Sequence, residues 1–223
     1  LDPCLGNGTF IIELIKKLRS YGHSMENIQG RIYGCDLKDR FINKIQKKLA
    51  KYQFDNIIQG DSLKKKFMNK KFDVVIGNPP YQNGKQSIWQ KFAMLGLDQL
   101  NEGGYLCFVH PATYRLRGNH KEISEYFDLM KSNYIVNLQL SNFQSSKKVF
   151  GEANTTADWY AICKEPANGR LTKVTDVNGN TSEIDLSDVA GIPDILNVDS
   201  DVVSLHDDTL DVIKGNNEFF SQN

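Results

Sequence analysis

The residues Asn78-Pro79-Pro80-Tyr81 are the part of this chain whose types and order best fit chemistry. They follow the apolar run 72–77, which is typical of a buried β-strand. Neither proline has a backbone N–H to donate, so the strand ends there and its last carbonyl oxygens face outward. Asn78 adds a side-chain amide and Tyr81 a flat aromatic ring. We therefore predict a group of acceptors beside a stacking surface, which suits a planar group that carries an NH2.

A second candidate is a glycine turn near the start of the chain, with the sequence Asp2-Pro3-Cys4-Leu5-Gly6-Asn7-Gly8-Thr9-Phe10. Glycines allow positive φ and let the backbone pass close to a ligand. Residues 9–19 have helical periodicity, so the segment is typical of the strand–turn–helix that binds nucleosides. The turn lacks the Gly-Lys-Ser/Thr ending of a triphosphate-binding loop, and residue 11 is Ile where a dinucleotide fingerprint has Gly. We expect an adenosine compound without a pyrophosphate.

Two acidic residues stand at the ends of the next two expected strands. Asp36 closes the run 31–35, and Asp61 follows the run 56–59. Acidic side chains at such strand ends bind ribose hydroxyls, a role that Asp36 fits, while Asp61 could accept from an adenine amino group. The alternative is that both carboxylates cap the helices that follow. Three acids at three successive strand ends, counting Asp2, favour binding.

Strand-like and helical segments alternate through residues 1–164, the pattern of an α/β domain with a largely parallel sheet. We expect helices at 9–19, 38–52, 87–100 and 119–130, and strands at 31–35, 56–59, 72–77, 104–109, 134–140 and 156–164, the last of them antiparallel. Trp89 and Phe92 are expected in the core. After residue 164, turn signals such as Asn178-Gly179 separate short β-like pieces, so we place a domain boundary near residue 165.

The net charge of zero hides an asymmetry. Residues 1–164 hold 24 Lys and Arg against 15 Asp and Glu, whereas residues 165–223 hold 3 against 12. A basic body suits a polyanionic partner, although Lys-rich helix faces can simply be solvated. The four cysteines form no C-x-x-C pair, so we expect free thiols in a reducing cytoplasm and no zinc or disulfide framework. No apolar run reaches the roughly 20 residues of a membrane span.

Taken together, residues 1–164 resemble the DNA adenine-N6 methyltransferases that use S-adenosylmethionine and carry an Asn-Pro-Pro-Tyr motif. The resemblance implies a Rossmann-like methyltransferase sheet with helices on both faces. Asp36 matches the family's ribose acid, and Asp61 its contact with the cofactor's adenine. The first cofactor motif corresponds to Asp2, Pro3, Gly6, Gly8 and Phe10, and Asn78 also borders the cofactor.

The resemblance makes Asn78, Pro79, Pro80 and Tyr81 the catalytic motif. Acceptors on both amino hydrogens, the Asn78 side-chain oxygen and the Pro79 carbonyl, would favour a pyramidal nitrogen and stabilise its developing positive charge. The adenine must be flipped out of the duplex, and aromatic rings can hold it. Tyr81 is one platform, and Phe150, in a loop expected before the strand 156–164, is the other unless it is a core aromatic. The chemistry needs no metal.

The resemblance also implies double-stranded DNA as substrate, a restriction–modification or phage-defence setting with a cognate restriction endonuclease as a further partner, and a cytoplasmic location. Leu1-Asp2-Pro3 has the pattern of a strand end, so we expect the first strand and an upstream motif to precede it. Residues 165–223 would begin a target-recognition or linking lobe. Two alternatives stay open, because a release-factor glutamine amide and an RNA guanine also present a planar NH2. Arg115, Arg117, Lys147 and Lys148 are candidate phosphate contacts, and His110 is expected to be structural or pocket-lining, not a base.

Overall fold

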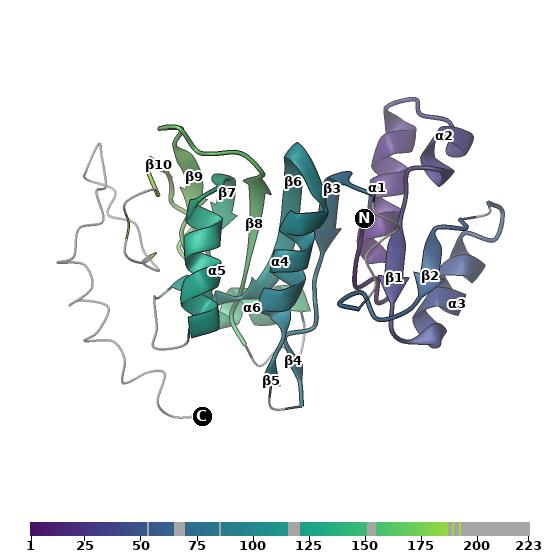
Figure 1. The fold of residues 1–223 in the computed structure, drawn as a ribbon, viewed down its shortest axis with the longest axis horizontal. Helices are drawn as coiled ribbons and strands as arrows, with labels where there is room; N and C mark the ends of the chain where they lie inside the picture. Colours follow the sequence, from purple (N-terminus) through teal and green to yellow (C-terminus); the bar gives the residue numbers. More distant parts are fainter. Residues whose placement is uncertain are drawn as a thin grey trace. The chain divides into compact units, whose positions relative to one another are not determined.

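The computed structural model describes residues 1–52, 54–64, 70–84, 86–115, 121–150, 155–186, 189 and 192. The chain divides into two compact units, Leu1–Phe108 and Val109–Asn223, and each is described by itself (Figure 1). Within the described ranges, no helix is long and apolar enough to cross a membrane.

The first unit alternates helices and strands as expected. Its elements are α1 (Thr9–Ser20), α2 (Met25–Gln29), β1 (Gly34–Asp36), α3 (Asp39–Lys48), β2 (Ile57–Gln59), β3 (Phe72–Gly77), β4 (Gln82–Asn83), β5 (Gln86–Ser87), α4 (Trp89–Gln99) and β6 (Leu100–Pro111), whose last three residues belong to the second unit. β1 pairs with β2 and β3 pairs with β6, both in parallel. The predicted parallel sheet is confirmed, with strand bounds within a few residues of those expected.

Leu1 and Asp2 occupy the strand position between β1 and β3. The Asp2 backbone N–H donates to the Tyr33 carbonyl at 2.9 Å, and the Cys35 N–H donates to the Asp2 carbonyl at 3.0 Å. On the other side, the backbone of Leu1 exchanges hydrogen bonds of 2.8 and 2.9 Å with β3. The parallel order is therefore β2, β1, residues 1–2, β3 and β6, and the strand end predicted at Leu1-Asp2 is present.

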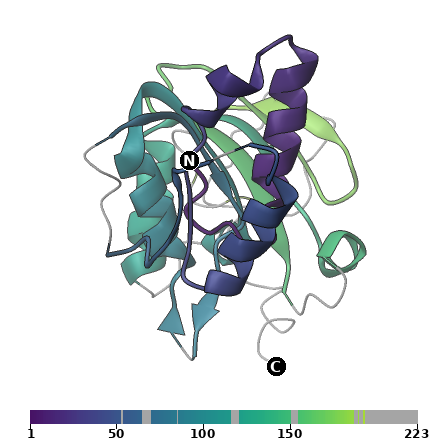
Figure 2. The ribbon, with the colours of Figure 1, turned by 90° about the vertical axis from the view of Figure 1, so that its right-hand side faces the viewer.

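Helices cover both faces of this sheet (Figure 2). α1 and α3 lie on one face, where their isoleucines pack with Leu5 and Ile57 in one buried cluster. α4 lies on the other face, and Gly96 permits a close approach because a Cβ there would lie 2.5 Å from the Leu106 side chain. The strands thus have helices packed on both faces, and the loops at their ends are where a ligand can reach the backbone.

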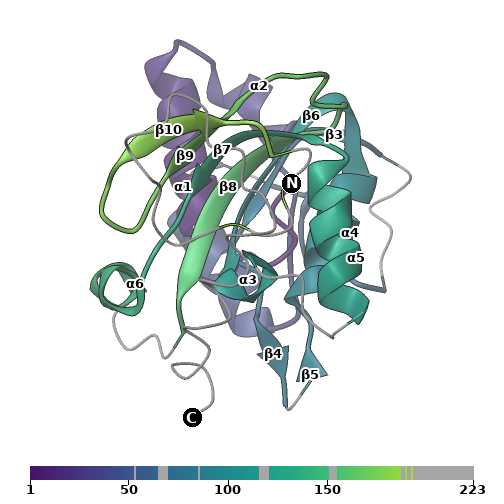
Figure 3. The ribbon, with the colours of Figure 1, turned by 90° about the vertical axis from the view of Figure 1, so that its left-hand side faces the viewer.

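The second unit contains η1 (Ala112–Arg115), α5 (Lys121–Lys131), β7 (Tyr134–Gln139), α6 (Phe143–Phe150), β8 (Ala157–Cys163), β9 (Thr172–Thr175) and β10 (Thr181–Ile184). Its strands lie in the order β10, β9, β7, β8. β8 runs antiparallel to β7, as predicted, and β9 runs parallel to β7. Figure 3 shows α5 and α6 on opposite sides of these strands.

Four features were not expected from the sequence: α2, the hairpin β4–β5, η1 and α6. The segment ahead of β8, predicted as a loop, is helical, and Phe150 is the last residue of α6. A reciprocal cap starts this helix, because the Ser145 N–H donates to Asn142 Oδ1 at 2.8 Å and the Asn142 N–H to Ser145 Oγ at 2.9 Å. The Phe150 side chain lies outside the described residues.

Residues 172–184 extend the sheet of the second unit beyond β7. Thr172 Oγ1 donates to the Ile135 carbonyl at 2.7 Å, and Val174 is fully buried. The change of composition near residue 165 therefore does not coincide with the division after Phe108. The separate lobe over 165–223 stays a prediction.

Candidate active site at the carboxyl ends of the strands

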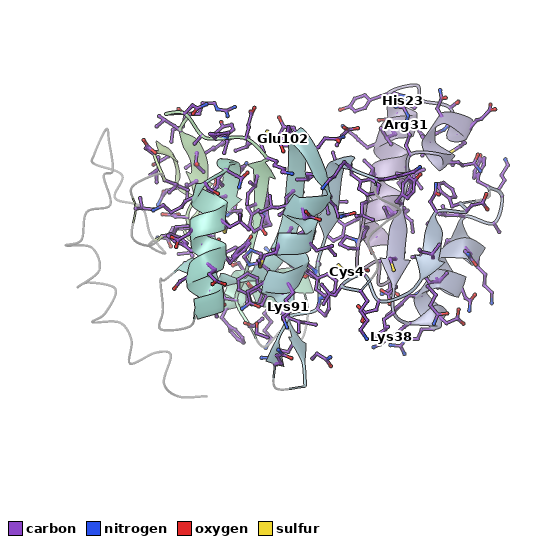
Figure 4. All side chains as sticks on the ribbon, in the orientation of Figure 1. Cys4, His23, Arg31, Lys38, Lys91 and Glu102 are labelled. Atoms are coloured by element: carbon purple, nitrogen blue, oxygen red, sulfur yellow. The ribbon has the colours of Figure 1, made fainter. Side chains whose placement is uncertain are left out.

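The candidate residues of the first unit gather at one end of its sheet. β1 and β3 both end there, at Asp36 and Gly77. In Figure 4, Cys4 of the glycine turn lies towards the same end as Lys38 and Lys91, which stand near the starts of α3 and α4. His23, Arg31 and Glu102 mark the opposite end.

The glycine turn needs glycine at two positions with positive φ. Gly6 has φ 49° and Gly8, the N-cap of α1, has φ 73°. A Cβ on Gly8 would lie 2.6 Å from Ile45 Cγ1, so a larger residue would push α3 away. A Cβ on Gly6 would meet no atom within 4 Å, which leaves its side of the turn open. The turn is therefore packed against the protein at Gly8 and accessible at Gly6.

Asp36 holds this turn in place. Its Oδ2 accepts a hydrogen bond from the Gly6 N–H at 2.8 Å, and its Oδ1 accepts from the Lys38 N–H at 2.9 Å. Because Lys38 is itself the N-cap of α3, Asp36 closes a local turn and does not cap the helix in the usual manner. Each carboxylate oxygen keeps a further lone pair, so the same side chain can still accept from a ligand hydroxyl.

The segment after β2 is tied to the glycine turn through a buried serine that the sequence did not single out. The Ser62 hydroxyl donates to the Pro3 carbonyl, and Ser62 is only 4% exposed. Asp61 accepts from the Leu63 N–H at 3.1 Å and lies 3.5 Å from Lys64 Nζ. Asp61 Oδ1 thus closes a local turn and Asp61 Oδ2 faces an exposed lysine, and neither contact is the helix cap considered as the alternative.

Two buried oxygen atoms at this end have no hydrogen-bond partner in the part of the chain that the structure describes, Asp2 Oδ2 and Asn78 Oδ1. Asp2 is fully buried, and only its Oδ1 is bonded to the backbone, by the Cys4 N–H at 3.0 Å. A Cβ on Gly77, the residue before Asn78, would lie 3.2 Å from Asp2 Oδ1, so Asp2 lies against Gly77. An unpaired buried acceptor costs about 1–3 kcal/mol, which points to a donor supplied by a ligand.

Burial also changes the protonation of this region. It raises the pKa of Asp2 to about 7, against the pull of the hydrogen bond from Cys4. Burial, followed by the charges of Asp2 and Asp36, raises the pKa of the Cys4 thiol well above its ordinary value. Cys4 therefore stays a thiol at neutral pH, which does not suit a nucleophile. All four cysteines are free, as predicted.

The four residues of the candidate catalytic motif differ in their exposure to solvent. Pro79 is buried, Pro80 is exposed, and Asn78 and Tyr81 are half-buried. The Tyr81 carbonyl accepts from the Ile88 N–H at 3.1 Å, which fixes the end of the segment. Phe10 is half-buried in the first turn of α1 and can line the glycine turn.

Four other residues considered in the sequence analysis have structural roles. Trp89 and Phe92 are 2% and 7% exposed, so their predicted core positions are confirmed. His110 is fully buried, and burial lowers its pKa to about 3, as expected of a structural histidine. The prediction that Arg115 contacts phosphate is wrong, because its guanidinium is buried in an ion pair with Asp158. Arg117 lies outside the described residues.

Comparison with known proteins places this geometry in a family. The family model for the Eco57I restriction-modification methylase matches residues 11–150, more than half of the chain. The modification methylase CviBIII of Paramecium bursaria Chlorella virus NC1A is 26% identical over 187 residues, covering 77% of this chain and 44% of that protein. An adenine-specific methylase of Mycoplasma pneumoniae, itself uncharacterised, is 25% identical over 182 residues, covering 75% and 42%. The chain thus spans less than half the length of these curated relatives.

Solved structures show the same fold at low sequence identity. The M protein of the type I restriction enzyme EcoKI has a TM-score of 0.64 at 16% identity, covering 78% of this chain and 43% of its own. A Listeria monocytogenes protein described as a class I S-adenosylmethionine-dependent methyltransferase has a TM-score of 0.59 at 16% identity, covering 79% and 57%. The α/β fold is that of class I S-adenosylmethionine-dependent methyltransferases, and the chain belongs to the Eco57I restriction-modification methylase family.

Proposed function

We propose that the protein transfers a methyl group from S-adenosylmethionine to the N6 amine of an adenine in double-stranded DNA. The observation that carries this proposal is a pair of buried oxygen atoms without a partner among the described residues, Asn78 Oδ1 and Asp2 Oδ2, at the end of the sheet that carries the open glycine turn. Membership of a restriction-modification methylase family supports a modification role. The names of the two curated relatives, a modification methylase and an adenine-specific methylase, support adenine as the target.

The glycine turn and the strand ends suit the cofactor. Asp2 Oδ2 needs a donor and, when ionised, would attract the cationic amino group of a methionine moiety. Asp36 already orients the Gly6 N–H and has lone pairs left for ribose hydroxyls. Asp61 would accept from the adenine amino group, with Pro3, Gly8 and Phe10 shaping the pocket. When bound, S-adenosylmethionine supplies a methyl group that its sulfonium centre has already activated.

The catalytic motif would act by positioning and electrostatics. Asn78 Oδ1 and the Pro79 carbonyl accept from the two hydrogens of the target amine, which directs the nitrogen lone pair towards the methyl group. Pro80 keeps the segment stiff because its φ is fixed. Tyr81 would stack on the flipped base, and Phe150, at the end of α6, remains the candidate for its other face.

We also propose a restriction–modification setting in the cytoplasm of a bacterial or phage-infected cell, with a cognate endonuclease as partner. Because the chain spans less than half of its curated relatives, the recognition region would lie largely outside these residues. Residues 165–223 are proposed to lead into a target-recognition or linking lobe.

The test is transfer of labelled methyl from S-adenosylmethionine to duplex DNA, RNA and release-factor protein, each offered separately. We expect label in DNA alone, recovered as N6-methyladenine after digestion to nucleosides. Label in the protein would support the glutamine alternative, and label in RNA the guanine alternative. Either result without label in DNA would overturn the proposed function.

A further inference from the structure

The hairpin β4–β5 follows directly on the candidate catalytic motif. It begins at Gln82, the residue after Tyr81, and ends at Ser87. Figures 1 and 3 both show it projecting from the carboxyl end of the first unit's strands, beyond the start of α4. The sequence did not predict this element, and nothing in the proposed chemistry uses it.

The base of the hairpin is fixed on both sides. The Ile88 N–H donates to the Tyr81 carbonyl at 3.1 Å, which closes the ladder immediately after the motif. Ser87 Oγ donates to Gln90 Oε1 at 2.8 Å, and Gln90 is only 3% exposed. Trp89, at the start of α4, is 2% exposed. The base of the hairpin is therefore hydrogen-bonded to Tyr81 and to the buried start of α4. Its position relative to Asn78 is fixed by these contacts.

Its outer part is a ribbon of carboxamides. Gln82 faces Ser87 across the ladder and Asn83 faces Gln86, so Asn83 and Gln86 share one side of the ribbon. Gln82, Asn83 and Gln86 are exposed, and their side chains bond to no other residue that the structure describes. Gly84 has φ 60°, which suits the first central position of a tight primed hairpin turn.

We propose that this hairpin reads DNA bases beside the target adenine, through the amides of Asn83 and Gln86. The proposal rests on the proposed function. Each carboxamide offers a donor and an acceptor side by side, the pattern that pairs with adenine N6 and N7 in the major groove, and that groove admits a two-stranded ribbon. The sequence of the hairpin has one charged residue, Lys85, which lies outside the described residues, and the amides of its two strands suit base edges better than phosphates.

The test uses the intact protein and duplexes in which the bases around the methylated adenine are randomised. Asn83→Ala with Gln86→Ala should relax the base preference at one or two positions by roughly 5- to 150-fold, while kcat on saturating preferred DNA stays within about twofold. The matched control, Gln46→Ala with Asn27→Ala, removes two exposed amides elsewhere in the same unit and should leave every preference unchanged.

Gln86→Glu is a second test variant. Position 86 is exposed, so the substitution should not impair folding, and the new carboxylate can only accept hydrogen bonds. It should shift the preference at the contacted position towards cytosine, whose N4 amino group donates. An unchanged preference profile in both variants would overturn the proposal, as would an equal loss on all sequences, which marks a backbone contact. Failure of the wild-type protein to methylate any DNA would instead overturn the proposed function.

Discussion

At the scale of single residues, the site is defined by what Asp2 and Asn78 lack. Most buried polar atoms in proteins are hydrogen-bonded, so two acceptors without a described partner at the same end of the sheet call for an explanation. A ligand that brings N–H groups to both provides one. The acids at strand ends, by contrast, already have partners: Asp36 bonds two backbone N–H groups and Asp61 bonds one. Their proposed ligand contacts would be added to these.

Asn78→Ala should abolish measurable methyl transfer, with a loss of at least about 100-fold in kcat, because it removes an acceptor from the reacting amine. S-adenosylmethionine affinity, measured by calorimetry, should change little. A parallel loss of cofactor binding would contradict the catalytic role. Gln99→Ala, which also removes a buried unpaired amide oxygen of the first unit, controls for effects of burial alone.

Asp36→Ala should weaken cofactor binding by about 1.5–3 kcal/mol, the worth of a charge-assisted hydrogen bond. Part of the loss would come from the released Gly6 N–H, so Asp36→Asn, which keeps one acceptor, should recover part of the affinity. Equilibrium binding of S-adenosylmethionine to the three proteins measures this. Equal affinities in all three would remove Asp36 from the ribose.

The buried carboxyl of Asp2 should make stability depend on pH. Its folded pKa of about 7 exceeds the ordinary value of 3.8, so between these pH values the folded state holds a proton that the unfolded chain has released. Stability should therefore fall as pH rises from about 4 to about 7, by up to about 4 kcal/mol. In Asp2→Asn, urea unfolding across this range should show a flatter profile, whereas exposed Glu13→Gln should match the wild type. Parallel profiles for Asp2→Asn and the wild type would refute this.

At the scale of elements, hydrophobic periodicity located the long helices and the strands that contain apolar residues. β3 has the predicted bounds, and α1 differs by one residue. The pattern failed where side-chain hydrogen bonds decide the structure. α6 begins with the exchange between Asn142 and Ser145, a weak signal in a polar stretch, and β4–β5 has no apolar face. The tie from Ser62 to Pro3 joins residues far apart in sequence, which no local pattern can reveal.

The ion pair between Arg115 and Asp158 joins three elements of the second unit. Arg115 lies in η1 and Asp158 in β8, and the Ser141 N–H, just after β7, donates to Asp158 Oδ1 at 2.8 Å. The guanidinium also donates to the Ser141 carbonyl at 2.7 Å, and the Tyr114 hydroxyl donates to Asp158 Oδ2 at 2.9 Å. This buried carboxylate therefore fixes both ends of the segment that carries α6.

Asp158→Ala should lower the free energy of unfolding by about 3–5 kcal/mol, because it leaves a buried guanidinium without its counter-charge. Urea titration followed by circular dichroism measures the change. Glu165→Gln breaks a solvent-exposed pair with Arg170 and should have a far smaller effect. A comparable loss of unfolding free energy in both variants would mean that burial of the Arg115–Asp158 ion pair does not account for its contribution to stability.

At the scale of the whole molecule, charge and architecture divide the chain at different places. Acidic residues dominate after residue 164, yet β9 and β10 complete the sheet of the second unit. The change of composition near residue 165 therefore does not mark the end of backbone pairing in the second unit, where Val174 and Ile184 are buried at 0% and 2% exposure.

A chain ending at Lys164 should aggregate or lose its cooperative thermal transition. Without β9, one edge of β7 would be unpaired, and the apolar side chains that pack on Val174 would be exposed. A chain ending at Pro193 keeps every contact described above and should retain a cooperative thermal transition. Differential scanning calorimetry of the two truncations decides the matter. A well-folded 1–164 fragment would restore the boundary predicted from composition.

The hydrogen bond at the base of the hairpin has a consequence for protein engineering. Both of its strands return to fixed neighbouring points, the Tyr81 carbonyl and the Ile88 N–H, so the residues between them can be exchanged without moving the catalytic segment. Such a cassette could be swapped among relatives, or randomised and selected for methylation of new sequences, while the cofactor site stays unaltered. On this proposal, the choice of DNA sequence depends on the hairpin, and methyl transfer depends on the segment before it.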